Sequence, residues 1–174
     1  MTCKAIAVQR GQVVLVDTNI IIEAFRAHCW NAMTTHFTVE TVETCYEEAL
    51  TGDPLRPDYI AVDAAQLRNG LRKRHAIGRE QCAQLVVRLA YKEGLDAGEI
   101  DLFAHALGRS DAWIASCADR AAVYAALELG WEDRFVSLEA MAHTAGAKPT
   151  LRHHFTDRWL QDMRTTYLLD RGLT

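Results

Sequence analysis

A run of strand-forming residues that ends in a carboxylate constrains the fold of this chain more than any other feature. Residues 13–16 read V-V-L-V, and Asp17, Thr18 and Asn19 follow directly. A short aliphatic run of this kind is typical of a strand buried on both faces of a parallel sheet. Ligands of open α/β sheets bind beyond the carboxyl ends of the strands, where Asp17 would stand. The same three polar residues also suit a turn and a helix cap, so this stretch alone leaves both roles open.

The remainder of the chain alternates helical patterns with short strands. Helices are predicted at 20–29, 41–50, 63–71, 79–93, 96–107, 120–129 and 137–143. Extended segments are predicted at 36–38, at 112–117 as a buried strand, and at 135–136 as an edge strand. This alternation predicts an α/β protein with a parallel sheet.

Length and composition favour one main domain. A chain of 174 residues that is 49% hydrophobic can build one good core. We place the domain at residues 1–147, including a helical, basic segment at 58–93, and a helical extension at 148–174. We expect an apolar stripe of the extension to dock on the domain or on a partner; its members are Trp159, Leu160, Met163 and Tyr167.

The composition also bears on the compartment. No apolar run reaches the roughly 18 residues that a membrane span needs, and the first residues lack the pattern of a secretory signal. The five cysteines are odd in number, widely spaced and without a C-x-x-C pair. We therefore expect a cytoplasmic protein without a membrane partner, whose reduced thiols pack as small hydrophobic groups. The cysteine pattern argues against a zinc site.

The net charge places a condition on any nucleic-acid partner. The formal net charge is −4, so RNA binding would need a local basic patch. The densest supply of cations lies in one segment, in which we place the nucleic-acid-binding side chains Arg68, Arg72, Lys73, Arg74 and Arg79. On a helix, these side chains would form either an RNA-binding ridge or an ordinary solvated face.

Acidic residues stand where predicted strands end and predicted helices begin. They are Asp17, Glu40, Glu43, Asp96, Glu99 and Asp119. If several share one crevice, two unit charges about 5 Å apart repel by roughly 3 kcal/mol at an effective dielectric near 20. A total stability of about 5–15 kcal/mol cannot absorb many such pairs. Either some acids stay protonated or a divalent cation neutralises them, and all-oxygen ligands point to Mg²⁺ or Mn²⁺.

Each acid also has a local role that needs no ligand. Asp96 and Glu99 have the spacing of a capping box, and Asp119 suits the cap of the next helix. Glu40 and Glu43 fit a solvated helical stripe. Only the ordered set of acids, rather than any single one, indicates a site.

Four short motifs in this order resemble the PIN domain, a metal-dependent nuclease family. They are V-L-V-D-T-N at 14–19, T-V-E-T-C-Y-E-E at 41–48, D-A-G-E-I-D-L-F-A at 96–104 and A-D-R-A-A at 118–122. The resemblance covers roughly residues 12–140. It implies a PIN-like three-layer α/β/α sandwich with a central, mainly parallel sheet, and phosphodiester hydrolysis with Mg²⁺ or Mn²⁺.

The resemblance also implies roles for single residues. Its catalytic acids fall on Asp17, Glu43, Glu99 and Asp119, with Asp17, Glu99 and Asp119 as the metal ligands. Glu40 is the alternative to Glu43, and Asp96 or Asp101 is the alternative to Glu99. Thr18 and Asn19 match the polar residues that orient the first acid.

One departure from the family pattern concerns the fourth acid. The family usually has Ser or Thr two residues before it, whereas this chain has Cys117 there and Ser116 one residue further back. A thiol is a poor substitute for a hydroxyl in metal or phosphate contacts.

The expected function is therefore a metal-dependent ribonuclease acting on single-stranded or structured RNA. The resemblance leaves open whether it is the toxin of a toxin–antitoxin pair, VapC-like and with a cognate antitoxin protein, or an RNA-processing enzyme, and it implies a homodimer. A PIN-fold interaction module with weak or no catalysis is the alternative, favoured by Cys117 and the acidic net charge. A haloacid-dehalogenase-like phosphohydrolase with Asp17 as nucleophile ranks lower, because Asn19 stands where that family has a second Asp.

Overall fold

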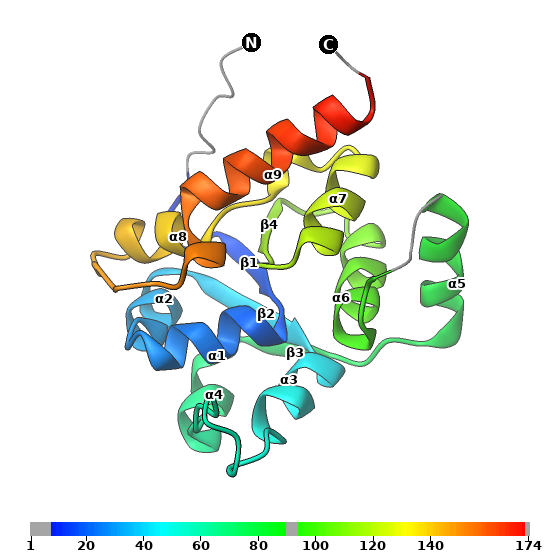
Figure 1. The fold of residues 1–174 in the computed structure, drawn as a ribbon. Helices are drawn as coiled ribbons and strands as arrows, with labels where there is room; N and C mark the ends of the chain where they lie inside the picture. Colours follow the sequence, from blue (N-terminus) through cyan, green and yellow to red (C-terminus); the bar gives the residue numbers. More distant parts are fainter. Residues whose placement is uncertain (1–7, 90–93, 173–174) are drawn as a thin grey trace.

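A four-stranded parallel sheet forms the centre of the protein in the computed structural model, which describes residues 8–89 and 94–172 (Figure 1). The strands are β1 (Val13–Val16), β2 (Thr38–Val42), β3 (Lys73–His75) and β4 (Trp113–Ser116). Their order is β3-β2-β1-β4, and every neighbouring pair is parallel. The predicted α/β class with a parallel sheet is confirmed.

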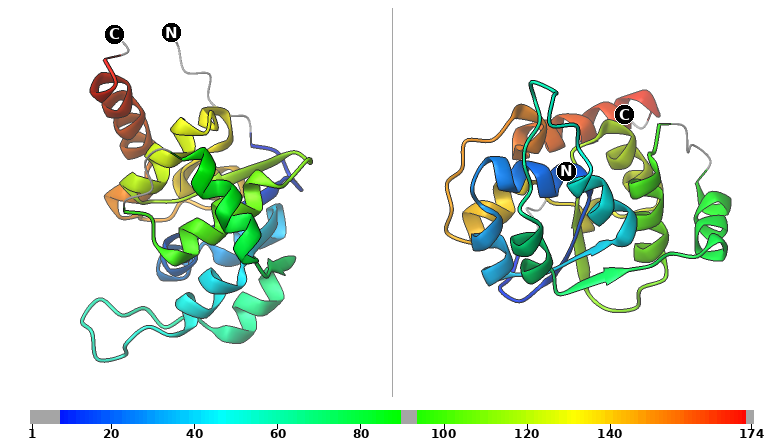
Figure 2. Two further views of the ribbon diagram at one scale, coloured as in Figure 1. Left: turned by 90° about the vertical axis from the view of Figure 1, so that its right-hand side faces the viewer. Right: turned by 90° about the horizontal axis from the view of Figure 1, so that it is seen from below.

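Helices cover both faces of this sheet, as Figures 1 and 2 show. One face carries α1 (Thr18–Arg26), α2 (Trp30–His36) and α8 (Leu138–Thr144), and the other carries α6 (Ala97–Leu107) and α7 (Arg120–Glu128). Helix α5 (Arg79–Arg88) packs on the outer side of α6 (Figure 1). Strand β1 divides the core, because Val14 and Val16 pack on the first side and Leu15 packs on the second. The predicted three-layer α/β/α sandwich is therefore confirmed.

The second strand takes residues that the sequence pattern assigned to a helix. The helix predicted to begin at Thr41 begins at Glu43, as α3 (Glu43–Leu50), because Thr41 and Val42 belong to β2. The main chain of β2 pairs with β1 over Val13–Leu15. The buried Thr41 hydroxyl also donates to the carbonyl of Val16, 2.7 Å away. Pairing with a distant strand thus overrides the local helical spacing.

We predicted that the basic segment 58–93 is helical, but part of it forms a strand. Helix α4 (Ala64–Gly70) is followed by the edge strand β3, which pairs with β2. A Cβ on Gly70 would lie 2.7 Å from Nε1 of Trp30, so glycine permits the close approach at this helix end. The helix predicted at 79–93 is α5, which ends at Arg88; residues 90–93 lie outside the described part of the chain.

The C-terminal extension packs on the domain. Helix α9 (Asp157–Asp170) follows the short 3₁₀ helix η2 (His153–Phe155) and lies across α7 and α8 (Figure 1). Trp159 and Leu160 are buried against Val123 of α7. Arg164 donates to the carbonyls of Glu132 and Phe135. The apolar stripe of this helix therefore contacts the domain itself.

Smaller features complete the architecture. Phe135 follows the 3₁₀ helix η1 (Glu132–Arg134) and forms a single parallel bridge with Ala115, where we predicted an edge strand. The described cysteines, Cys29, Cys45, Cys82 and Cys117, are free, and all but Cys82 are buried. Within residues 8–89 and 94–172, no helix has both the length and the apolar character that a bilayer crossing demands.

The packing of α9 on α7 predicts that the extension unfolds together with the domain. Leu160→Ala removes a side chain that is 4% exposed, and we expect it to lower the free energy of unfolding by about 2–4 kcal/mol. Leu169→Ala, on the same helix but 58% exposed, should change it by less than about 0.5 kcal/mol. Urea unfolding followed by circular dichroism measures both. A separate early transition for α9 would contradict a single cooperative unit.

Candidate metal centre at the carboxyl edge of the sheet

Asp17 and Asp119 lie at one edge of the sheet, beyond adjacent strands. Strands β1 and β4 are parallel, with Val16 opposite Ser116, so the residues that follow them leave the sheet side by side. Each aspartate also caps the helix that it precedes. Asp17 Oδ1 accepts from the amide of Ile20 at 2.8 Å, and Asp119 Oδ1 accepts from the amide of Ala121 at 2.7 Å. The cap uses one oxygen of each carboxylate.

The first turn of α6 brings two further acids together. Asp96 Oδ1 accepts from the amide of Glu99 at 2.8 Å, and Glu99 Oε2 accepts from the amide of Asp96 at 3.1 Å. The predicted capping box is therefore confirmed. Glu99 is only 2% exposed, although a carboxylate that served as a cap alone could remain in water.

Two carboxylate oxygens at this edge are buried without a hydrogen-bond partner among the described residues. They are Oδ2 of Asp17 and Oε1 of Glu99. The weak thiol donor of Cys117 also contacts the Asp17 carboxyl group. A buried polar atom left unpaired costs about 1–3 kcal/mol, and a charged one costs more. Proteins keep such atoms where a proton, a water or an ion satisfies them. These two oxygens are the atoms here that a cation would satisfy.

The pKa values of Asp17 and Glu99 are both raised, by burial and by neighbouring carboxylates. Burial raises the pKa of Asp17 from 3.8 to about 7, with further increases from the charges of Asp96 and Asp119. Burial raises the pKa of Glu99 to about 8, and the charges of Asp96, Asp17 and Asp119 add to the shift. Without a cation, Glu99 is thus largely protonated at pH 7, and Asp17 is about half protonated.

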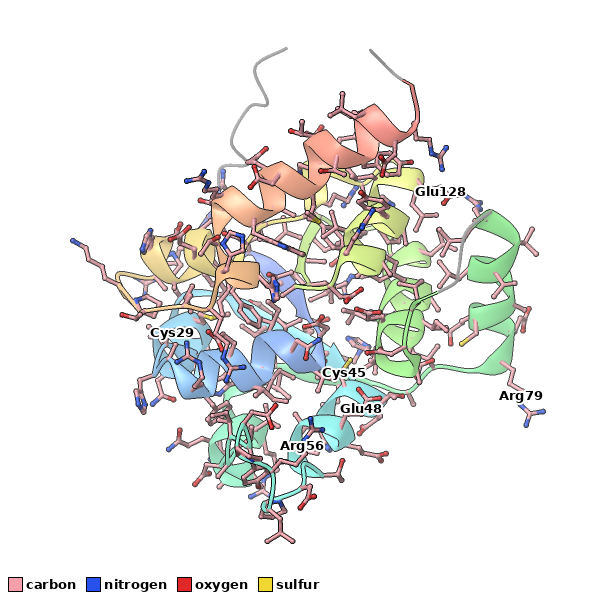
Figure 3. All side chains as sticks on the ribbon, in the orientation of Figure 1. Cys29, Cys45, Glu48, Arg56, Arg79 and Glu128 are labelled. Carbon is pink, nitrogen blue, oxygen red and sulfur yellow. The ribbon has the colours of Figure 1, made fainter. Side chains whose placement is uncertain are left out.

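Glu48, a residue that we did not predict to belong to the site, joins these acids from α3. The Thr18 hydroxyl, next to Asp17, donates to Glu48 Oε2 at 2.7 Å. A Cβ on Gly98, in the first turn of α6, would lie 2.8 Å from the same oxygen and 2.9 Å from Cys45 Sγ. Glu48 and Cys45 are labelled on α3 in Figure 3. The Glu48 carboxylate therefore lies between the residue after Asp17 and the start of α6.

Helix geometry explains why Glu48 and not Glu43 takes this place. At 100° per residue, Glu48 lies beside the buried face that holds Cys45 and Ala49, whereas Glu43 projects from the opposite face. The Glu43 carboxylate is 40% exposed and lies 3.5 Å from Nη1 of Arg74. The position of Glu48 beside the apolar face of its helix was therefore a signal in the sequence that could have identified it.

Glu40, the predicted alternative to Glu43, belongs to a different group on β2. Its Oε2 contacts His75 Nε2 at 2.8 Å and Arg109 Nη1 at 2.6 Å. One donor atom each from Glu40, His75 and His105 lie within 4.8 Å of one another. In the described part of the chain, no other set of three possible ligand atoms is as close, so the acids around Asp17 are more widely spaced. Mg²⁺ tolerates such spacing because it keeps several waters and takes one or two carboxylates directly.

The remaining predicted supporting residues differ in their placement. Thr18 bonds to Glu48, whereas Asn19 is exposed on the first turn of α1. Ser116 is fully buried with an unpaired hydroxyl, and alternation along β4 turns it away from the face on which Cys117 packs. Burial and the charges of Asp17 and Glu99 raise the pKa of Cys117 well above its ordinary value, so its thiol is neutral.

The predicted nucleic-acid-binding side chains, namely Arg68, Arg72, Lys73, Arg74 and Arg79, are all exposed. They come from α4, the link between α4 and β3, the edge strand β3 itself and the start of α5, rather than from one helix. Arg74 lies over the ring of Tyr46, 4.2 Å from its centroid, and Arg79 points outward from α5 (Figure 3). Because β3 is parallel to β1, its carboxyl end lies at the same edge of the sheet as Asp17.

Comparison with known proteins adds no relative. No protein-family model, no curated protein and no solved structure matches this chain. A function for it therefore rests on the geometry of its side chains and on the resemblance of its four motifs.

The raised pKa of Asp17 predicts how stability depends on pH without a divalent cation. Between about pH 4 and pH 7, the native state binds a proton that the unfolded chain releases, so Asp17 makes stability fall as pH rises. Asp17→Asn cannot ionise. We expect the variant to gain about 2–4 kcal/mol relative to the parent protein between pH 5 and pH 8.

Urea unfolding in a chelator at several pH values measures this difference. Asp133→Asn, an exposed residue on η1 with the same change of charge, is the matched control and should show a flat difference. A flat difference for Asp17→Asn as well would contradict a protonated, buried Asp17.

Proposed function

We propose that this protein is a metal-dependent ribonuclease of the PIN type, which hydrolyses phosphodiester bonds in RNA with Mg²⁺ or Mn²⁺. The observation that carries the proposal is the pair of buried, unpartnered oxygens on Asp17 and Glu99 at the carboxyl edge of a parallel sheet. Carboxylates gathered in this way are costly unless a cation neutralises them. Hard divalent cations prefer all-oxygen donor sets of this kind.

The residues that would hold the ion are Asp17, Glu99 and Asp119, with Glu48 in the place that we had given to Glu43. Asp96 supports Glu99 through the capping box. When bound, a divalent cation supplies the Lewis acid and the activated water for phosphodiester hydrolysis, so no side-chain nucleophile is required.

The surrounding chain holds these acids in place. The amides at the starts of α1 and α7 each occupy one aspartate oxygen, which leaves the second oxygen directed away from the cap. The hydroxyl of Thr18 orients Glu48, and Gly98 leaves space for that carboxylate. Outer partners of this type keep metal ligands in position.

The exposed arginine and lysine side chains of the segment from α4 to α5 would bind the RNA. The edge strand β3 contains Lys73 and Arg74, and Arg72 comes just before it. The carboxyl end of this strand lies at the same edge of the sheet as Asp17. Side chains of this type bind phosphates with little sequence preference, and the binding weakens as salt rises. The otherwise acidic protein would repel RNA from its other surfaces.

A PIN-fold interaction module is the second candidate, favoured by Cys117. Its buried, neutral thiol stands where the family usually has a hydroxyl. A module of this kind would bind Mn²⁺ at the acids yet cleave neither RNA nor DNA. A homodimer, a cytoplasmic location and, for a toxin, a cognate antitoxin belong to the first candidate by resemblance alone.

Cleavage of single-stranded RNA by the purified protein tests the proposal. We expect Mg²⁺- or Mn²⁺-dependent cleavage that a chelator stops. Asp17→Asn and Asp119→Asn should each lower the rate by at least about 100-fold, because even outer partners of metal ligands cost about 10–100-fold. Asp133→Asn is the control. Cleavage that persists in both site variants would point to a contaminant, and metal binding without cleavage would favour the interaction module.

Three neighbouring glutamates on α3 distinguish the acid that completes the site. Glu48→Gln should slow cleavage by about 10–100-fold, since its carboxylate is the one held by Thr18. Glu47→Gln, at an exposed position, and Glu43→Gln, beside Arg74, should leave the rate at fixed low salt unchanged. Equal rates for Glu48→Gln and Glu47→Gln would show that Glu48 plays no part in the reaction.

A further inference from the structure

A group of four polar side chains lies on the sheet face that α6 covers, apart from the acids around Asp17. Glu40 comes from the middle of β2, His75 from the end of β3, His105 from the last turn of α6, and Arg109 from the residues after that helix. Glu40 lies opposite Leu15 in the sheet, and Leu15 packs in the core beneath α6. Residues far apart in sequence thus meet at one point.

The donor atoms of this group converge. Glu40 Oε2 lies 2.8 Å from His75 Nε2, and the two imidazole rings stack with centroids 3.7 Å apart. Arg109 Nη1 lies 2.6 Å from Glu40 Oε2 and 2.9 Å from His105 Nε2. One nitrogen of a cation therefore touches two of the three possible ligand atoms, which lie within 4.8 Å of one another.

We propose that Glu40, His75 and His105 form a binding site for a divalent transition-metal ion of the Zn²⁺ type, and that the Arg109 guanidinium takes the place of the ion when none is bound. Two imidazole nitrogens and one carboxylate are a common protein ligand set for zinc, with a fourth position left for water. The hard cations suited to the acids around Asp17 have no preference for imidazole. The proposal therefore stands independently of the nuclease function.

The protonation states suit metal binding. Burial lowers the pKa of His105 to about 4, and the nearby Arg109 guanidinium adds to the shift, so this ring is neutral at pH 7. Burial by itself would raise the pKa of Glu40, but hydrogen bonds from His75 and Arg109 hold it below its ordinary value. A neutral imidazole and an ionised carboxylate are the forms that bind metal.

Arg109 has a second partner to which it can withdraw. Its Nε donates to Asp111 Oδ1 at 2.8 Å, and its Nη2 donates to Asp111 Oδ2 at 2.5 Å. The Asp111 side chain is half exposed, whereas those of Glu40, His75 and Arg109 are each about one-tenth exposed. The bidentate pair with Asp111 can therefore persist at the surface after the guanidinium leaves Glu40.

A purely structural network of hydrogen bonds is the alternative, and Arg109 distinguishes the two. In a network, loss of Arg109 leaves the buried Glu40 carboxylate short of a partner and only destabilises the protein. In a metal site with a competing guanidinium, loss of Arg109 strengthens metal binding. The two readings thus predict different results for a single variant, Arg109→Met.

Titration calorimetry with Zn²⁺ tests the site. The Asp17→Asn/Asp119→Asn double variant serves as the parent protein, with excess Mg²⁺ present, so that the acids around Asp17 do not contribute. We expect one ion per chain, with affinity lowered at least about tenfold in His75→Ala and in His105→Ala, the loss expected when one donor of a metal site is removed. His153→Ala, on η2, is the matched control and should bind as the parent does.

Arg109→Met should raise the affinity by about tenfold, which corresponds to one hydrogen bond to a charged group. Electron paramagnetic resonance of the Cu²⁺-loaded parent should show two imidazole nitrogens, and each histidine variant should show one. Circular dichroism confirms that each variant is folded. Unchanged Zn²⁺ affinity in both histidine variants, or no binding by either the parent or Arg109→Met, would overturn the proposal and leave a hydrogen-bond network.

Discussion

The mutual repulsion of buried carboxylates at the carboxyl edge of the sheet is the constraint on which the functional argument depends. The carboxyl ends of all strands in a parallel sheet lie at one edge. Asp17 and Asp119 therefore lie near each other once β1 and β4 pair. Glu99 and Asp96 arrive from the start of α6. The positive ends of helix dipoles offset part of the repulsion. The raised pKa values of Asp17 and Glu99 show that burial outweighs this benefit.

Capping and ligand binding are compatible roles for these acids, because a carboxylate has two oxygens. One oxygen of Asp17 holds the amide of Ile20, and the other is buried without a partner. Glu99 divides its oxygens in the same way, between the amide of Asp96 and an unpaired position. The backbone thus fixes each carboxylate through one oxygen and leaves the second available. An acid that looks like a simple cap in the sequence can therefore also line a site.

The two groups of polar side chains differ in how their charge is balanced. Around Glu40, the guanidinium of Arg109 supplies the positive charge within the protein, and that carboxylate stays ionised. Around Asp17, no cationic side chain is among the main contributors to its pKa, and protons take that role instead. This contrast follows from the elements that deliver the residues. Around Asp17, the starts of helices contribute amides and carboxylates. Around Glu40, the segment after α6 contributes the arginine.

The sequence by itself determined the features that depend on neighbours in the chain. The strand at 13–16, the buried strand predicted at 112–117, the capping box of Asp96 and Glu99, and the cap at Asp119 were correctly predicted, because each arises within a few residues. Only the tertiary structure decided that β2 extends to Val42, so that α3 begins at Glu43. It also decided that Lys73–His75 forms an edge strand and that Glu48 lies beside Thr18. Those outcomes depend on partners 25 or more residues away, and local periodicity has no information about such partners. For the same reason the convergence of His75 and His105 was invisible, since three separate elements must pack before their donor atoms meet.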